Sequence, residues 1–191
     1  RDPVTGRGRK KRIKMELPKG WQMCRTLGEP VADALLFSLK VPLDEAFRGN
    51  GTEAWRPALF LDRMHEKGLK VGMVVDLTFT TKYYQPSEFT SRGVQHLRIP
   101  ERGHSMAPDP RNLERFCEAL RTFWQQHPGE HVGVHCTHGL NRSGFFIVYF
   151  LVTRMGLLLP QALDAFARSN PPGIWDRDYI IHLSKSFNYP H

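Results

Sequence analysis

Four apolar runs rich in branched side chains recur along the chain and predict the strands of one sheet. They cover residues 35–42 (LLFSLKVP), 71–78 (VGMVVDLT), 94–100 (VQHLRIP) and 131–136 (HVGVHC). Each run is short, carries β-branched residues, and has Pro or Gly near an end, as buried strands do.

Longer segments with apolar residues three or four positions apart lie between these runs and predict helices. These segments are 53–67, 111–126, 142–156, about 160–169, and 176–187. The pair Asp109–Pro110 is typical of an N-cap followed by the favoured first helical position. Strands that alternate with helices predict an α/β domain, with a mostly parallel central sheet and helices on both faces.

Length and charge divide the chain into a tail and one domain. The 191 residues carry a net charge of +8, and residues 1–14 alone hold seven Lys or Arg against one Asp. We expect residues 1–14 to form a disordered basic tail and residues 15–191 to form a single domain. Two interpretations of the tail stay open: contact with nucleic acid or a nuclear address, or a solvated arm.

Several classes are disfavoured by what the chain does not contain. No run of eighteen apolar residues indicates a membrane span, and the start has no apolar segment typical of a secretory signal. The three cysteines have no paired C-x-x-C spacing, which argues against a disulfide framework or a structural zinc site. We expect a protein of a reducing compartment that needs no metal or cofactor. Because the chain does not begin with Met, we also expect a fragment or a processed chain.

Residues 131–146 (HVGVHCTHGLNRSGFF) carry the clearest chemistry. They predict a strand, a tight loop and a buried helix that starts near Arg142, so loop amides and a helix N-terminus converge on an anion. Such a site lowers the pKa of a thiol at its rim, here Cys136. Arg142 can then bind two phosphoryl oxygens through its planar guanidinium, and Ser143 can hydrogen-bond the thiolate. The implied reaction is displacement at phosphorus through a phosphocysteine.

The predicted phosphate-binding residues are the loop itself: Thr137, His138, Gly139, Leu140, Asn141 and Arg142. The competing interpretation is structural, with Cys136 as an inert buried thiol and Arg142 as a surface residue. The flanking His135, Ser143 and the strand–loop–helix context favour the catalytic interpretation.

HCTHGLNRSG resembles the signature loop of the cysteine-dependent, protein-tyrosine and dual-specificity-like phosphatases, in particular their RNA 5′-triphosphatase branch. That branch includes the triphosphatase domain of mRNA capping enzymes and a related stand-alone RNA phosphatase. The resemblance covers residues 17–187 through the segments GWQMC, KVPL, VVDLTFTTKYY, GVHCTHGLNRSGF and NPPGIWDRDYI. Two departures stand out: Ser143 replaces a usual threonine, and Asp176 stands where capping enzymes tend to have a basic residue.

The resemblance implies a single cysteine-phosphatase-like domain that removes the γ-phosphate from 5′-triphosphate RNA without a metal. It further implies a nuclear monomer whose partners are triphosphate RNA and possible capping partners, namely a guanylyltransferase domain or RNA polymerase II. The loop lacks the lysines usual in phosphoinositide phosphatases and has Asn141 where dual-specificity phosphatases usually have serine. Two alternatives stay open: a protein tyrosine or dual-specificity phosphatase, and a catalytically silent module that binds RNA ends or polymerase.

The general acid is the least determined residue. Asp76 ends a strand at the edge of the sheet where ligands commonly bind, so it is the first candidate, although a structural hydrogen-bonding role fits equally. Asp109 fits a helix cap better than an acid, and His104 could act as an acid or bind phosphate. His135 is expected to orient the loop or tune the thiolate.

A 5′-triphosphate also needs cations beyond the loop. Four residues in segments that could flank the site are candidates for RNA or outer-phosphate contacts: Lys82, Arg102, His104 and Arg177. A residue of this kind is more often a solvated surface charge, and this interpretation stays open for each of the four. The remaining cysteines, Cys24 and Cys117, are expected to be packing residues.

Overall fold

The protein is described by a computed structural model that covers residues 15–47 and 55–190. The predicted basic tail (1–14), the first two positions of the helix expected over 53–67, and the last residue lie outside the described residues.

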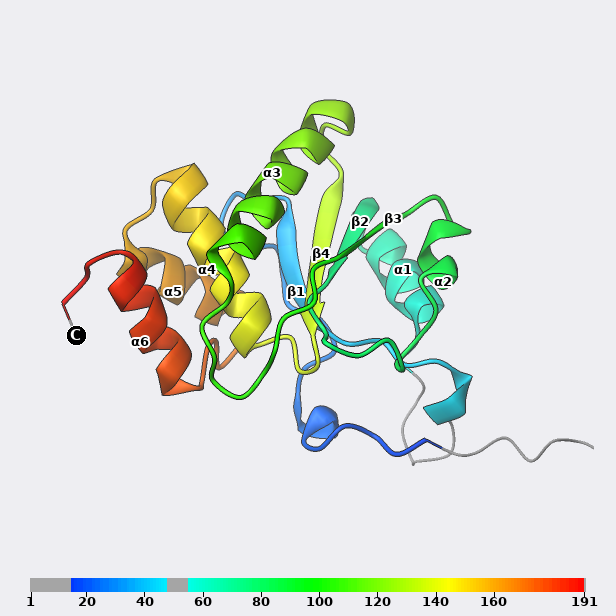
Figure 1. Ribbon diagram of the computed structural model, residues 1–191. Coiled ribbons are helices and arrows are strands. Elements are labelled where there is room, and N and C mark those ends of the chain that lie inside the picture. The colour runs from blue at the N-terminus through cyan, green and yellow to red at the C-terminus, as the bar shows by residue number, and fades with distance from the viewer. Residues whose placement is uncertain (1–14, 48–54, 191) are drawn as a thin grey trace, which may run out of the picture.

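All four predicted strands are present, and they form one sheet in the order β1-β4-β2-β3 (Figure 1). Their bounds are β1 (Leu36–Lys40), β2 (Val71–Asp76), β3 (Gln95–Arg98) and β4 (His131–Cys136). Every pair of neighbouring strands is parallel, which confirms the predicted α/β class. β4 lies inside the sheet between β1 and β2, so the strand that ends in Cys136 is held on both sides.

The five predicted helices are also present. They are α1 (Pro57–Glu66), α3 (Pro110–Gln126), α4 (Asn141–Met155), α5 (Leu159–Ser169) and α6 (Arg177–Ser186). Three short elements were not predicted: α2 (Ser87–Thr90), η1 (Trp21–Met23) and η2 (Glu45–Phe47). They span a single turn each, too short to show a helical period. The Asp109 carboxylate accepts a hydrogen bond from the Arg111 amide at 2.9 Å, so the predicted N-cap of α3 is confirmed.

Helices cover both faces of the sheet because side chains alternate along each strand. Val75 and Val134 face a core that contains α3, α4, α5 and α6. Phe37, Leu39 and Val74 face the opposite core, which contains α1 and α2. The predicted helix that is apolar nearly all round is α4, and it packs against the sheet, α3, α5 and α6 (Figure 1).

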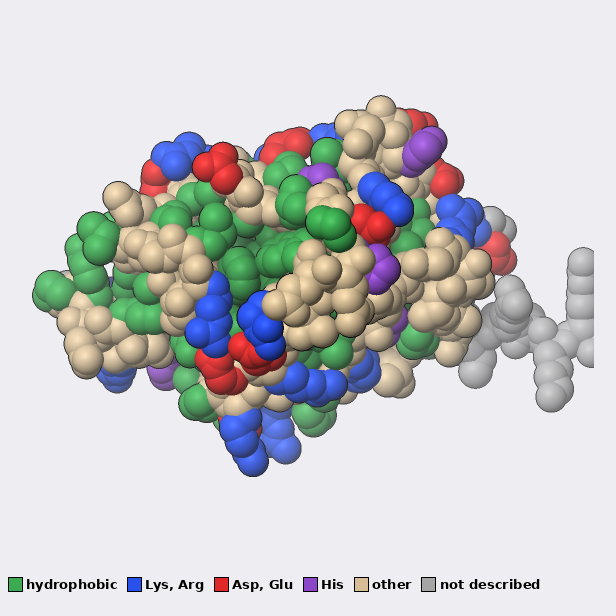
Figure 2. All heavy atoms as spheres, turned by 90° about the horizontal axis from the view of Figure 1, so that it is seen from above, with side chains coloured by type: hydrophobic (Ala, Val, Ile, Leu, Met, Phe, Trp, Pro, Cys, Tyr) green, Lys and Arg blue, Asp and Glu red, His purple; other side chains and the backbone are tan. Residues whose placement is uncertain are grey.

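In a parallel sheet the carboxyl ends of the strands share one edge, so the loops after β1, β2, β3 and β4 gather there. The opposite end of the molecule is seen from above in Figure 2, where Lys and Arg side chains lie beside Asp and Glu side chains. Among the described residues, no helix combines the length and the hydropathy that a membrane crossing requires.

Candidate active site

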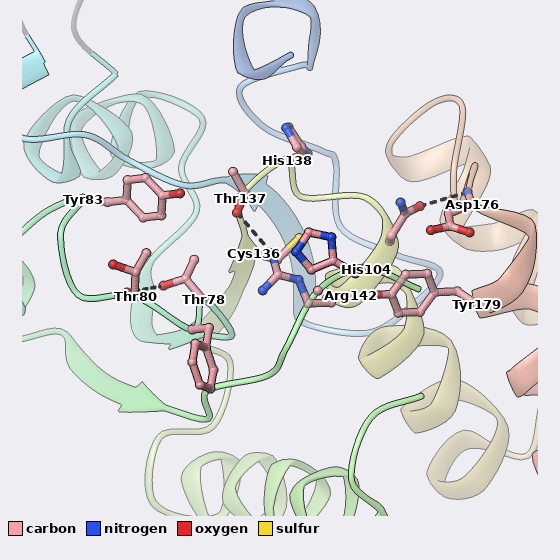
Figure 3. A pocket seen from close by; sticks show the side chains of 13 residues that line it. Thr78, Thr80, Tyr83, His104, Cys136, Thr137, His138, Arg142, Asp176 and Tyr179 are labelled. Atoms are coloured by element: carbon pink, nitrogen blue, oxygen red, sulfur yellow. Dashed lines mark hydrogen bonds between the residues drawn. The ribbon is translucent and has the colours of Figure 1, made fainter. Parts of the chain in front are cut away.

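Cys136 lies at the floor of a pocket of about 410 Å³ at the carboxyl edge of the sheet (Figure 3). It is the last residue of β4, pairs with Lys40 of β1, and is only 3% exposed. The chain then turns through residues 137–140 into α4. Gly139 has a φ of +75°, and a Cβ there would lie 2.5 Å from the carbonyl carbon of Leu39. Only glycine therefore permits this turn so close to β1.

The Cys136 thiol has a pKa below the ordinary cysteine value, although the residue is buried. Burial by itself raises this pKa, but the nearby positive charge of Arg142 and hydrogen bonds from the Ser143 hydroxyl and the Ser143 and Gly139 amides together lower it by more. The Ser143 hydroxyl is buried and has no other hydrogen-bond partner among the described residues. The thiolate is therefore its available acceptor, and the site favours the nucleophilic form.

The guanidinium of Arg142 is held by loops that follow other strands. One terminal nitrogen donates to the carbonyl oxygen of Glu101 at 2.9 Å and to that of Leu77 at 3.3 Å. The other donates to the Thr137 hydroxyl at 3.1 Å (Figure 3). These bonds fix the plane of the group and leave its remaining N–H donors for a phosphoryl group.

The N-terminus of α4 points at the same site. Leu140, at the N-cap position, makes no side-chain cap, so the first amides of the helix are left for a ligand. Of the six predicted phosphate-binding residues, four line the pocket: Thr137, His138, Asn141 and Arg142. Gly139 and Leu140 do not line it, and their side of the loop faces the protein, so only their backbone is available to an anion.

Three contacts anchor the loop, and the sequence did not point to the first. Asn170, which is buried, donates to the Gly139 carbonyl oxygen at 3.1 Å and to the Ser38 hydroxyl at 2.8 Å. The Asn141 side chain accepts from the amides of Trp175 and Asp176, so it ties the loop to the start of α6. The His138 ring lies 2.8 Å from the Lys19 carbonyl oxygen. Asn170 belongs to the NPPG segment, which the sequence indicated as a break between two helices without indicating this contact.

Asp76, the first candidate for the general acid, does not line the pocket. Its side chain is 6% exposed and both oxygens are engaged: one accepts from the Thr78 amide at 2.7 Å and lies 2.6 Å from the Thr78 hydroxyl. The other accepts from Arg98 at 2.9 Å. This arrangement favours the structural hydrogen-bonding role over that of an acid, because a carboxylate paired with Arg98 and outside the pocket lining is not placed to contact a substrate.

The other two candidates for the acid are placed differently from each other. Asp109 caps α3, pairs with Arg111 at 2.8 Å, and does not line the pocket. His104 lines the pocket and has a φ of +63°, followed by Ser105 at +60°. Left-handed backbone is uncommon for such residues and is tolerated where surrounding contacts hold it. Here Ser105 donates to the Asp176 carboxylate at 2.6 Å, which fixes His104 above the pocket.

The other candidate cationic residues beyond the loop lie outside the pocket lining, at different positions around it. None of Lys82, Arg102 and Arg177 lines the pocket directly. Lys82 lies over the ring of Tyr83 with its nitrogen 5.5 Å from the centroid, and Tyr83 is a pocket residue. Arg102 lies over the ring of Phe79, another pocket residue, at 5.4 Å. Arg177 begins α6 directly after the N-cap of that helix.

His135 is fully buried behind Cys136, where its ring lies 2.6 Å from the Tyr84 hydroxyl, which in turn lies 2.9 Å from His96. Burial lowers the pKa of His135 to about 4, so the ring is neutral. A neutral imidazole has one donor and one acceptor, so the series His135–Tyr84–His96 fixes the ring of His135 and with it the end of β4.

Sequence reasoning missed several pocket residues that carry no cysteine-phosphatase signal of their own. They are Thr78, Phe79, Thr80, Gly103 and Tyr179. Tyr83 also lines the pocket, as does Asp176, which the sequence had marked as a departure from the capping enzymes. Burial raises the pKa of Tyr179 to about 12, so its hydroxyl keeps its proton. Among the described residues, no three His, Cys, Asp or Glu side chains gather closely enough to hold a metal ion.

A model of the dual specificity phosphatase catalytic domain matches residues 59–187, which include the whole site. The chain belongs to the dual specificity phosphatase family. The expectation of a cysteine-dependent phosphatase of α/β class is therefore confirmed. The fold agrees: the crystal structure of Tk-PTP in the active form has a TM-score of 0.56 and 25% identity, over 80% of this chain and 91% of that one.

Several curated proteins that are similar to this chain have names that refer to RNA. The mRNA-capping enzyme of Mus musculus is 33% identical over 174 residues, 90% of this chain and 29% of the mouse protein. The RNA/RNP complex-1-interacting phosphatase of Rattus norvegicus is 28% identical over 180 residues, 92% of this chain and 55% of the rat protein. The chain thus spans only part of each relative.

Proposed function

We propose that the protein is an RNA 5′-triphosphatase that removes the γ-phosphate of triphosphorylated RNA through a phosphocysteine. The observation that carries this proposal is a low-pKa thiol and a fixed guanidinium on the floor of one pocket, in a chain similar to a capping enzyme over 90% of its length. The RNA substrate rests on the relatives' names, and the chemistry rests on the pocket.

The proposed reaction has two displacements at phosphorus. The Cys136 thiolate attacks the γ-phosphorus, an S–P bond forms, and the bond to the bridging oxygen breaks, so RNA leaves with a 5′-diphosphate. Arg142 and the amides of residues 137–142 stabilise the charge on the three equatorial oxygens. Water then breaks the S–P bond and releases phosphate. The Ser143 hydroxyl stabilises the thiolate as it departs.

A diphosphate end is a weakly basic leaving group, so it needs less protonation than an alkoxide. This fits a pocket that Asp76 and Asp109 do not line. His104, the candidate that does line it, is proposed to contact the leaving β-phosphate or the outer oxygens. Lys82 and Arg102, which stack on pocket aromatics, are proposed to supply longer-range positive charge.

In the cell we infer a nuclear role in mRNA capping or related 5′-end processing. A diphosphate end is the product that a guanylyltransferase activity consumes, so such a domain or RNA polymerase II is the proposed partner. The basic tail (1–14) would add affinity for RNA in this setting.

The test is release of phosphate from γ-labelled 5′-triphosphate RNA in EDTA, compared with release from a phosphotyrosine peptide. We expect wild type to act on the RNA in the chelator and Cys136→Ser to lose that activity. Turnover of the peptide alone would assign the chain to the protein phosphatases. RNA that is bound but not cleaved by wild type would indicate a silent binding module.

A further inference from the structure

Phe79 is an exposed aromatic side chain at the mouth of the pocket. Its exposed fraction is 60%, and of the exposed large hydrophobic side chains among the described residues it is the one that lines the pocket. Trp175 is similarly exposed, at 65%, but does not line it. An apolar ring held open to water beside a phosphate site has surface that a ligand can cover.

Hydrogen bonds from buried side chains fix the backbone on both sides of Phe79. Asp76 binds the amide of Thr78, and the Thr78 hydroxyl lies 2.9 Å from the Thr80 carbonyl oxygen (Figure 3). Arg98, which pairs with Asp76, also donates to the Thr80 carbonyl oxygen at 3.3 Å. The buried Asp76–Arg98 pair therefore holds the residues before and after Phe79. This makes Asp76 a positioning residue for the rim of the pocket.

A cation accompanies the ring. The Arg102 guanidinium carbon lies 5.4 Å from the Phe79 ring centroid, within the range of a cation–π contact. Arg102 follows Glu101, whose carbonyl oxygen binds Arg142, and precedes Gly103, which lines the pocket. The Phe79–Arg102 pair thus belongs to the same rim as the phosphate-binding arginine.

We propose that Phe79, supported by Arg102, is a stacking subsite for the first nucleobase of a 5′-triphosphorylated RNA. The inference rests on the proposed function and adds where the nucleoside binds. With the γ-phosphate at Cys136, two phosphates and a ribose separate the base from the floor, so the base lies at the rim. Stacking on a ring accepts any base, so this subsite distinguishes a nucleoside end from a bare polyphosphate without reading sequence. The Arg102 charge offsets that of the outer phosphates.

The test is a double-mutant cycle on a Cys136→Ser background, which binds without turning over. The probes are a 5′-triphosphorylated RNA and the same RNA with an abasic first nucleotide. We expect Phe79→Ala to weaken binding of the intact RNA about tenfold and Phe79→Trp to preserve it. With the abasic probe, Phe79→Ala should change the dissociation constant less than about twofold, because the partner of the ring is already gone. Trp175→Ala, matched in exposure, should not separate the two probes.

Equal losses with both probes would overturn the subsite, since they would indicate a general disturbance of the pocket. No loss with either probe would overturn it as well, because the base would then lie elsewhere. The proposed function is judged separately, by phosphate release from triphosphate RNA with wild type. Release from RNA together with unaltered binding by Phe79→Ala would keep the triphosphatase and discard only the stacking subsite.

Discussion

Two buried cysteines of this protein differ in the property that decides reactivity. Cys136 is 3% exposed and Cys117, on α3, is 0% exposed. Burial raises the pKa of Cys117 to about 11, because the charge of Arg154 and hydrogen bonds with Thr153 and Arg154 do not compensate for it. The pKa of Cys136 is lowered, because the charge of Arg142 and three hydrogen bonds outweigh burial.

The comparison indicates that the surroundings of the loop, and not access to solvent, lower the pKa of a thiol in this fold. Both thiols are enclosed by apolar side chains of the same core. What differs is the set of N–H and O–H donors that surrounds a negative sulfur. A phosphate accepts the same donors, so one arrangement serves the nucleophile and the substrate.

The sharpest way to break the comparison is to remove each of the two cysteines in turn. We expect Cys136→Ser to lower the rate of phosphate release by at least about 10⁴-fold, since the nucleophile is lost. Cys117→Ala should keep the wild-type rate and lose only some stability. The measurement is single-turnover release from labelled triphosphate RNA. Activity that persisted in Cys136→Ser would place the nucleophile elsewhere.

The second largest effect tests the charge that separates the thiols. Arg142→Lys keeps a positive charge but loses the planar pair of donors and the contacts to Leu77 and Glu101. We expect kcat/KM to fall about 10²–10³-fold, because one donor set for the transition state is removed. Steady-state kinetics on the same RNA would measure it, with Arg177→Lys, outside the pocket, as the control. Equal effects of the two variants would contradict a special role for Arg142.

A third prediction concerns His135, which is adjacent to Cys136. Its pKa, like that of Cys117, is shifted mainly by burial. Its pKa of about 4 lies below the ordinary value, so the unfolded state binds the extra proton first. The buried neutral ring of His135 therefore contributes to the free energy of unfolding. This contribution is fully present above about pH 6.5 and is lost as the pH falls toward 4, by about 3 kcal/mol in total.

The measurement is urea unfolding at pH 7 and pH 4.5 for wild type and His135→Asn. The variant should be less stable at pH 7 but show a smaller loss between the two pH values. If both proteins lost the same free energy of unfolding on acidification, other groups would account for the dependence. The surface variant His65→Asn should follow wild type.

The smallest effect sharpens the comparison at one hydrogen bond. Ser143→Ala removes the buried hydroxyl that lowers the pKa of Cys136, so that pKa should rise. Alkylation of Cys136 by iodoacetamide should then reach its half-maximal rate at a higher pH. Hydrolysis of the phosphocysteine should slow about tenfold. Ser143→Thr, which keeps the hydroxyl, should resemble wild type. An alkylation profile that did not move would remove Ser143 from the account.

Local pattern was enough to predict most of the fold. Branched apolar runs indicate strands, and the 3.6-residue spacing in α3 and α5 indicates helices, because these periods follow from backbone geometry. The loop of residues 137–142 could also be recognised from the sequence, since its candidate phosphate-binding residues occupy consecutive positions. The short elements η1 and α2 were missed for the opposite reason, because one turn has no period.

The sequence did not predict side-chain contacts that depend on the folded structure. Asp76 ends a strand at the functional edge, yet its partners Arg98 and Thr78 lie so that its carboxylate faces away from the pocket. Asn170 donates a hydrogen bond to Gly139 from 31 residues away in the chain, and no local sequence pattern predicts that contact.

The sequence by itself determined the class of fold, the candidate loop that carries Cys136 and Arg142, and the relation to the dual specificity phosphatases. Only the tertiary structure decided which acids reach the pocket, how Arg142 is held, and that Phe79 stands open at the rim. The reason is physical. Backbone periodicity and a contiguous loop are encoded locally, whereas burial and the direction of a side chain depend on elements that pack from distant parts of the chain.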